Sequence, residues 1–399
     1  MPISQSDLKS KGSKTERYLL IAGILFIAFN LRSALASVGP LISHIRSSTG
    51  LPNSMLGLLT TLPLIAFAVV SSFTSLFTRR FGIGGTLLGA LFLLAVGIAI
   101  RSLNGIVTLY LGTLLLGIAI AFGNVLLPSL VKWKFSSRSG FITSLYVSVM
   151  GIGASIASGI SIPLVDRLHW GWRGSLAIWS ISALLAFFIW LPQLNRLKNT
   201  EPNHSYRKAM KALGKSPVAW KIALFMGLQS LTGYVILAWL PAILQSRGYN
   251  DEFSGWMLSL AQVAGMAGSL VIPLWAGKKT NQRSIVAFLA VVETVGILGL
   301  LFPHAGLVGV WVFLIGFVTG GTFGLALLFI VLRSKDAQAT TELSGMAQSI
   351  GYLIAATGPI IFGSLFDITG NWNDSLILLL LVAFLKLYTG LGAAKNRGL

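Results

Sequence analysis

Three ionisable side chains lie within long apolar stretches of the sequence: Arg32, Glu293 and Lys386. A charged side chain in such a stretch is expected to have a specific structural or functional role. Arg32 lies in the apolar run 18–42, which holds no acidic residue. A charge at the centre of a bilayer costs at least ~2.5–3.5 kcal/mol, so such a side chain faces a bundle interior or a watery cavity. If the neighbouring helices supply no anion, a bound solute can supply one. Arg32 is therefore the first candidate for binding a ligand.

Glu293 and Lys386 lie in two later apolar runs, 284–302 and 374–392. Two interpretations stay open for them. They can form an ion pair embedded in the membrane, or Lys386 can snorkel towards the surface, and both are structural roles. Alternatively, Glu293 acts as an acid that couples proton movement to a second process.

These residues sit in a chain that is apolar along its whole length. It has 399 residues, of which 54% are hydrophobic and only 10% are charged. An apolar run of 18 or more residues is long enough to cross a hydrocarbon core of ~30 Å. The sequence therefore predicts an all-α integral membrane protein with twelve transmembrane helices. The expected spans are 18–43, 53–77, 83–101, 106–131, 139–165, 172–191, 218–244, 253–276, 284–302, 306–332, 341–366 and 374–392.

The first of these runs is too long for a signal peptide, and no cleavage site of the A-x-A kind follows it, so we expect it to be retained.

The sequence has no cysteine, which excludes disulfides and thiolate metal sites. Its four histidines are too scattered for a metal site, and no nucleotide-binding loop, nucleophile motif or intramembrane pair of carboxylates occurs. We expect neither an enzyme nor a cofactor. A channel is disfavoured because no ring of like charges is present.

The formal net charge of +19 suggests a nucleic-acid partner, but the distribution of the charge argues against one. Lys and Arg concentrate in the N-terminal tail, in the stretch 192–217 and in every second loop. This is the positive-inside pattern, and it predicts that both termini are cytoplasmic. It also predicts contact with anionic membrane lipids. The opposite loops keep only a few basic residues: Arg46, Arg101, Arg167, Arg173 and Arg247.

The sequence also contains an internal repeat. Leu25-Phe26 corresponds to Leu224-Phe225, Pro40 to Pro241, and Trp172 to Trp372, at a nearly constant offset of half the chain. Two six-helix halves that start on the same side form a parallel repeat, which places a central site near the midplane and predicts transport. The expected segments are a cytoplasmic tail 1–17, a first bundle 18–191, a basic linker 192–217, a second bundle 218–392 and a C-terminal tail 393–399.

Several strings carry a resemblance to a known family. They are Asn30-Leu31-Arg32, Val38-Gly39-Pro40-Leu41-Ile42, Gly57-Leu58-Leu59-Thr60-Thr61-Leu62-Pro63-Leu64, Arg79-Arg80-Phe81-Gly82, Gly123-Asn124-Val125-Leu126-Leu127-Pro128, Gly171-Trp172-Arg173 and Trp190-Leu191-Pro192-Gln193. The layout resembles the major facilitator superfamily, and within it the group of cyanate and 2-nitroimidazole transporters. One departure is that no acidic residue precedes Arg79-Arg80, so the gate-locking ion pair of the wider superfamily cannot be carried over. Another is that the fifth span lacks the adjacent Gly-Pro of drug antiporters.

The resemblance implies that spans one, four, seven and ten line a cavity and that spans two, five, eight and eleven flank it. Polar and aromatic residues in these spans are the candidate substrate-binding residues: Arg32, Asn124, Tyr146, Gln229, Tyr234, Trp239, Gln262, Gln348 and Tyr352. Asn30 and Arg32 are about 200° apart on a helix, so we expect Arg32 alone to face the cavity.

Each candidate has a plain structural alternative. Arg32 can be satisfied by backbone carbonyls or by Asn30 and Asn124. Pro128 removes the hydrogen bond to the carbonyl of Asn124, so the Asn124 amide can either cap that freed backbone or contact a substrate. The glutamines can join helices, and the aromatic residues can simply pack.

The sequence thus predicts a monomeric secondary transporter of the bacterial cytoplasmic membrane, working by alternating access. The expected substrate is a small anion such as cyanate, held by Arg32. The alternative is efflux of a small heteroaromatic compound such as 2-nitroimidazole. Protons are a candidate coupling ion, and no nucleic acid or metal is expected.

Overall fold

The computed structural model describes residues 14–51, 53–194, 197, 206–302 and 307–394, and nearly all of them are helical. Among these residues, ten continuous helical stretches are long and apolar enough to cross a membrane. Two of them, Met55–Arg101 with 47 residues and Ile106–Asp166 with 61, are each long enough to cross twice. The predicted tails and linker lie partly outside the described residues.

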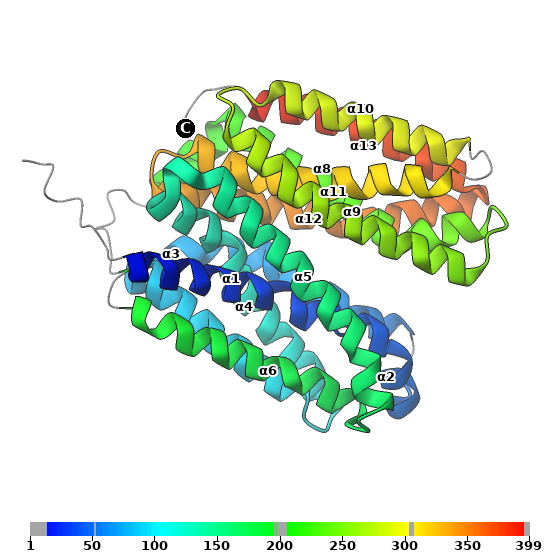
Figure 1. Cartoon of the computed structure of the whole chain (residues 1–399), viewed down its shortest axis with the longest axis horizontal. Coiled ribbons are helices and arrows are strands. Elements are labelled where there is room, and N and C mark those ends of the chain that lie inside the picture. Colours follow the sequence, from blue (N-terminus) through cyan, green and yellow to red (C-terminus); the bar gives the residue numbers. More distant parts are fainter. Residues whose placement is uncertain (1–13, 52, 195–196, 198–205, 303–306, 395–399) are drawn as a thin grey trace, which may run out of the picture.

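Figure 1 shows the helices as two bundles. The first half consists of α1 (Lys14–Ala36), α2 (Ile42–Thr49), α3 (Asn53–Arg101), α4 (Ile106–Phe135), α5 (Ser139–Asp166) and α6 (Gly171–Trp190). The second consists of α8 (Pro217–Gln245), α9 (Asp251–Gly277), α10 (Arg283–Leu301), α11 (Val308–Arg333), α12 (Ala337–Thr369) and α13 (Trp372–Ala393). The short helix α7 (Tyr206–Lys215) lies between them.

The long helix α3 is two spans joined at Gly82. Gly82 has φ +71° and ψ 170°, a conformation that interrupts the helix and that glycine adopts without a steric penalty. With α3 counted as two crossings, the described part of each half holds six crossings. The predicted fold of twelve transmembrane helices in two six-helix halves is therefore confirmed.

The repeat is also visible in which helices pack together. α3 packs on α4 as α9 packs on α11, and α1 packs on α5 as α8 packs on α12. In the same way, α3 contacts α6 and α10 contacts α13. Equivalent helices therefore make equivalent contacts in the two halves, as a duplicated chain predicts.

The first span departs from the prediction of one continuous helix over 18–43. α1 ends at Ala36, and the 3₁₀ turn Gly39–Leu41 leads into α2. Pro40 accounts for the break, because it has no N–H to donate to the carbonyl of Ala36 and its ring would collide with that carbonyl. At the other end of the chain α12 starts four residues earlier than expected, at Ala337, because the Asp336 side chain accepts a hydrogen bond from the Ala339 N–H at 2.8 Å.

The halves touch each other near the end of the molecule where α1 begins and α13 finishes; we call this region the closed end. There the Ser72 hydroxyl donates to the Ser349 hydroxyl at 2.8 Å, and the Arg79 guanidinium lies 2.8 Å from the Glu342 carboxylate. Among the described residues, no hydrogen bond or ion pair joins α5 beyond Ser155 to the second half. In Figure 1, α2 and the far part of α5 lie away from the second bundle.

Candidate functional site

Arg32 lies on α1 with its side chain exposed, while its neighbour Asn30 is only 1% exposed. The Asn30 amide donates to the carbonyls of Phe26 at 2.9 Å and Ser182 at 3.3 Å, so it faces its own bundle. The two side chains therefore point to opposite sides of α1, as their spacing predicts. Among the described residues none forms a hydrogen bond or ion pair with Arg32.

Instead, Arg32 meets an aromatic ring of the other half. Its guanidinium carbon lies over the ring of Phe323 on α11, 5.0 Å from the ring centroid. A cation within about 6 Å of a ring centroid is attracted by the negative face of the ring, by roughly 0.5–2 kcal/mol. This contact crosses between the two halves, so the only charge in the first span sits where they meet.

Two tyrosines of the second half lie within electrostatic range of Arg32: Tyr234 on α8 and Tyr352 on α12. The Tyr352 ring packs against Phe67 of α3, with 4.9 Å between the ring centroids. The Tyr352 hydroxyl accepts a hydrogen bond from the Asn124 amide at 3.3 Å. The site therefore combines one cation of the first half with aromatic rings and phenol hydroxyls of the second half, and it can hold a solute that is flat and electron-rich.

Asn124 bonds Tyr352, Gln348 lies one turn before Tyr352 on α12, and both belong to the contact between the halves. The Gln348 amide nitrogen donates to the backbone carbonyl of Asn124 at 2.7 Å. That carbonyl is the one that Pro128 leaves without its helical partner. The freed backbone is thus capped by Gln348 from α12, while the side chain of Asn124 bonds Tyr352.

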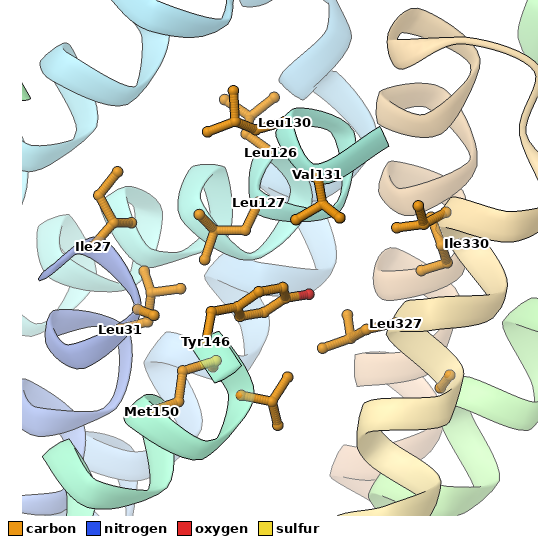
Figure 2. Close-up of a cluster of buried hydrophobic side chains, with 14 of the residues drawn as sticks. Ile27, Leu31, Leu126, Leu127, Leu130, Val131, Tyr146, Met150, Leu327 and Ile330 are labelled. Carbon is orange, nitrogen blue, oxygen red and sulfur yellow. The ribbon is translucent and has the colours of Figure 1, made fainter. Parts of the chain in front are cut away.

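Tyr146 is enclosed by apolar side chains in the described conformation. Its side chain is 1% exposed within an apolar cluster, and Figure 2 shows its ring among Leu127, Val131, Met150 and Leu327. Its hydroxyl has no hydrogen-bond partner among the described residues. Tyr146 therefore packs where the halves close on each other.

Three further candidates make no hydrogen bond or ring contact with Arg32 among the described residues. The Gln229 amide donates to the Met226 carbonyl and the Ser230 hydroxyl, both close to it on α8. The Trp239 indole donates to the Pro359 carbonyl of α12 at 2.9 Å and packs on Trp372. Gln262 is exposed on α9 and makes no hydrogen bond to a described residue.

Glu293 and Lys386 form a buried ion pair with 2.5 Å between the charged atoms, and their side chains are 1% and 3% exposed. The Lys386 ammonium also lies 3.4 Å from the hydroxyl of Thr232 on α8, two residues before Tyr234. The second carboxylate oxygen of Glu293 has no partner in the described part of the chain. The pair ties α10 and α13 to α8.

Three features of the site escaped prediction. Phe323 is an apolar residue in an apolar span, one helical turn after Thr319, and so carries no signal in the sequence. Arg101 was expected in an outer loop, but it is buried and donates to the Ala34 carbonyl at 2.8 Å. Glu342 pairs with Arg79, so an ion pair joins the halves although the loop acid of the wider family is missing.

No group of His, Asp or Glu side chains among the described residues could hold a metal ion.

The family profile described as Major Facilitator Superfamily matches residues 21–359. The chain is 42% identical over 385 residues to a 2-nitroimidazole transporter of Escherichia coli (strain K12), with 96% of this chain and 98% of that protein covered.

The chain is also 29% identical over 351 residues to the cyanate transport protein CynX of Escherichia coli (strain K12), with 88% of this chain and 90% of that protein covered. Among solved structures, that of the Escherichia coli fucose:proton symporter FucP gives a TM-score of 0.75 at 13% identity, with 93% of this chain and 97% of that one covered. This last similarity concerns the fold alone.

Proposed function

The chain belongs to the Major Facilitator Superfamily and is a multi-pass membrane transporter, and from this premise we propose that it carries a small anion or nitro compound held by Arg32. The observation that carries the proposal is the exposed guanidinium of Arg32, which has no hydrogen-bonding or charged partner among the described residues and lies between the halves. A planar fork of N–H donors suits a carboxylate-like or nitro group.

Two substrates follow from this arrangement. A small anion such as cyanate is favoured by the missing counter-charge of Arg32, and a cyanate transport protein is among the relatives. A small heteroaromatic compound is favoured by the ring of Phe323, over which Arg32 lies, and by Tyr352, which is within electrostatic range of Arg32. A relative with higher identity is a 2-nitroimidazole transporter.

The proposed mechanism is alternating access of the bundle 18–191 against the bundle 218–392. With both termini in the cytoplasm, as the distribution of Lys and Arg suggests, the closed end faces inwards and Arg32 is reached from outside. We place the protein in the bacterial cytoplasmic membrane as a monomer. Glu293 is the candidate group for proton coupling, and Lys386 is its partner.

The test is equilibrium binding of cyanate and of 2-nitroimidazole to purified protein carrying Arg32→Lys or Arg32→Gln. Hydrogen bonds to a charged group contribute roughly 1.5–3 kcal/mol, so Arg32→Gln should weaken binding of the true substrate by about 10- to 100-fold. Arg32→Lys should lower the affinity for an anion that accepts two hydrogen bonds from the guanidinium. It should change the affinity little for a ligand that is held mainly by packing against aromatic rings. Arg46→Lys, at an exposed position on α2, is the matched control. Unchanged binding of both ligands to Arg32→Gln would make Arg32 a structural residue.

A further inference from the structure

The Arg32 guanidinium lies over the ring of Phe323, and Phe323 comes from the opposite half of the molecule. The Phe323 side chain is half-buried, so its ring is packed against the second bundle yet is not enclosed by it. It lies on α11 one turn after Thr319, whose hydroxyl is taken up by the Ile315 carbonyl of its own helix. The face that α11 presents to Arg32 is therefore aromatic rather than polar.

A guanidinium that lies over a ring keeps its N–H donors free, because those donors point outwards in the guanidinium plane. A carboxylate or nitro group that accepts two of these bonds lies in the same plane as the guanidinium. If that group is attached to an aromatic ring, the solute ring continues the plane and comes to lie among the site's aromatic side chains. A linear triatomic anion bonded to Arg32 is too small to contact these aromatic side chains as well.

The surrounding residues suit a flat ring. Tyr234 and Tyr352 are both within electrostatic range of Arg32, and Tyr352 is already in ring contact with Phe67. The Tyr352 hydroxyl is positioned by the Asn124 amide, which leaves its own O–H able to donate to a solute. The aromatic side chains around Arg32 thus come from α8, α11 and α12, and the cation comes from α1.

We propose that Phe323 is a specificity-determining residue and that the substrate is a small aromatic ring bearing a carboxylate or nitro group. The oxygen group accepts hydrogen bonds from Arg32, and the ring packs on Phe323. This inference rests on the proposed function, since it places the substrate at Arg32. It goes further by requiring an aromatic ring and by assigning its recognition to a residue of the second half.

The test compares ligands that differ only by the ring. Binding of benzoate, acetate, cyanate and 2-nitroimidazole to the purified full-length protein is measured by calorimetry. The unaltered protein should bind benzoate and 2-nitroimidazole at least tenfold more tightly than acetate or cyanate. Equal affinities for benzoate and acetate would overturn the requirement for an aromatic ring without any variant being made.

Phe323→Leu and Phe323→Met then remove the ring, and Phe323→Tyr keeps it. An aromatic pair contributes roughly 0.5–1.5 kcal/mol beyond simple burial, so the first two variants should weaken benzoate and 2-nitroimidazole by about 2- to 10-fold and leave acetate unchanged. Phe323→Tyr should retain the affinity. Phe313→Leu, an exposed phenylalanine of the same helix, is the control.

Equal weakening of all four ligands by Phe323→Leu would overturn the proposal, since the ring would then act only by holding Arg32. A failure of the proposed function looks different. In that case Arg32→Gln leaves every ligand unaffected, whatever Phe323 does.

Discussion

At the scale of single residues, two kinds of intramembrane charge occur in the same protein. Glu293 and Lys386 neutralise each other at 2.5 Å within the second bundle. Arg32 has no such partner among the described residues and lies over a ring between the bundles. A charge that is paired inside one bundle serves that bundle, whereas a charge left between bundles is available to a solute.

The ion pair leads to a prediction about stability. Glu293→Gln leaves the Lys386 ammonium buried without a counter-charge, which costs up to about 3–5 kcal/mol in buried pairs. Thermal unfolding in detergent should show a clear loss of stability. The double variant Glu293→Met with Lys386→Met should recover most of it, because no charge is then left buried.

The same variants separate the structural role from proton coupling. If Glu293 carries the coupled proton, the stable double variant should lose uptake driven by an imposed pH gradient and keep exchange of substrate for substrate. Uptake that still follows the pH gradient in the double variant would show that Glu293 serves only the packing of α8, α10 and α13.

Individual residues were predictable where local geometry decides their direction. The angle between Asn30 and Arg32 on a helix was enough to predict that the two side chains point to opposite sides of the helix. Phe323 was not predictable in this way, because an apolar residue in an apolar span carries no signal until its neighbours in space are known. Tyr146 is the opposite case. Its hydroxyl makes it a candidate binding residue in the sequence, yet the structure buries it among aliphatic side chains.

At the scale of helices, Pro128 of α4 creates the acceptor for a contact between the halves. It leaves the Asn124 carbonyl without an intrahelical partner, and Gln348 of α12 donates to that carbonyl at 2.7 Å. A helix bond would be permanent, whereas the bond to Gln348 can break when α4 and α12 separate. The proline thereby turns a fixed bond of the helix into a reversible one at the closed end.

Pro128→Ala should therefore weaken the closed end, because the new N–H at position 128 competes for the Asn124 carbonyl. Loss of about one hydrogen bond, ~1 kcal/mol, corresponds to about a fivefold shift towards opening. The chain has no cysteine, so Ser71→Cys can report the shift. Ser71 is 1% exposed on α3 next to Gly345, and its cysteine should react with a thiol reagent only when the closed end opens.

Gln348→Ala should raise the reactivity of the Ser71→Cys reporter in the same direction. Pro163→Ala is the matched control, since Pro163 lies in the far part of α5, away from the closed end. Equal labelling rates with and without Pro128 would contradict a role of this proline in closing the protein.

The course of the helices was largely predictable, because apolar length alone specifies where a chain can cross a bilayer. The exception, the end of α1 at Ala36, has a local cause in Pro40 that the sequence contains but that apolar length does not register. Pairings between the halves, such as Arg79 with Glu342, could not be predicted. They join positions far apart in the chain and depend on which of the alternating conformations is adopted.

At the scale of the whole molecule, the contacts between the halves follow the repeat. α3 meets α12 and α5 meets α9, and these two pairs of helices are related to each other by the duplication. The first pair is joined by Ser72 with Ser349, and the second by Ser148 near Ser269. Hydroxyl contacts of this kind are weak enough to be broken and remade as the halves move.

A covalent link across one of these contacts tests alternating access directly. The Ser72 and Ser349 hydroxyl oxygens are 2.8 Å apart, so Ser72→Cys with Ser349→Cys places two thiols within reach of a disulfide. Oxidation should abolish transport in proteoliposomes, since the closed end can no longer open, and a reductant should restore it. Binding at Arg32 should persist in the oxidised protein, because the site is approached from the other end. The single variants Ser72→Cys and Ser349→Cys should transport normally under oxidation. Continued transport by the cross-linked protein would mean that the halves do not separate at this end and that the solute takes another route.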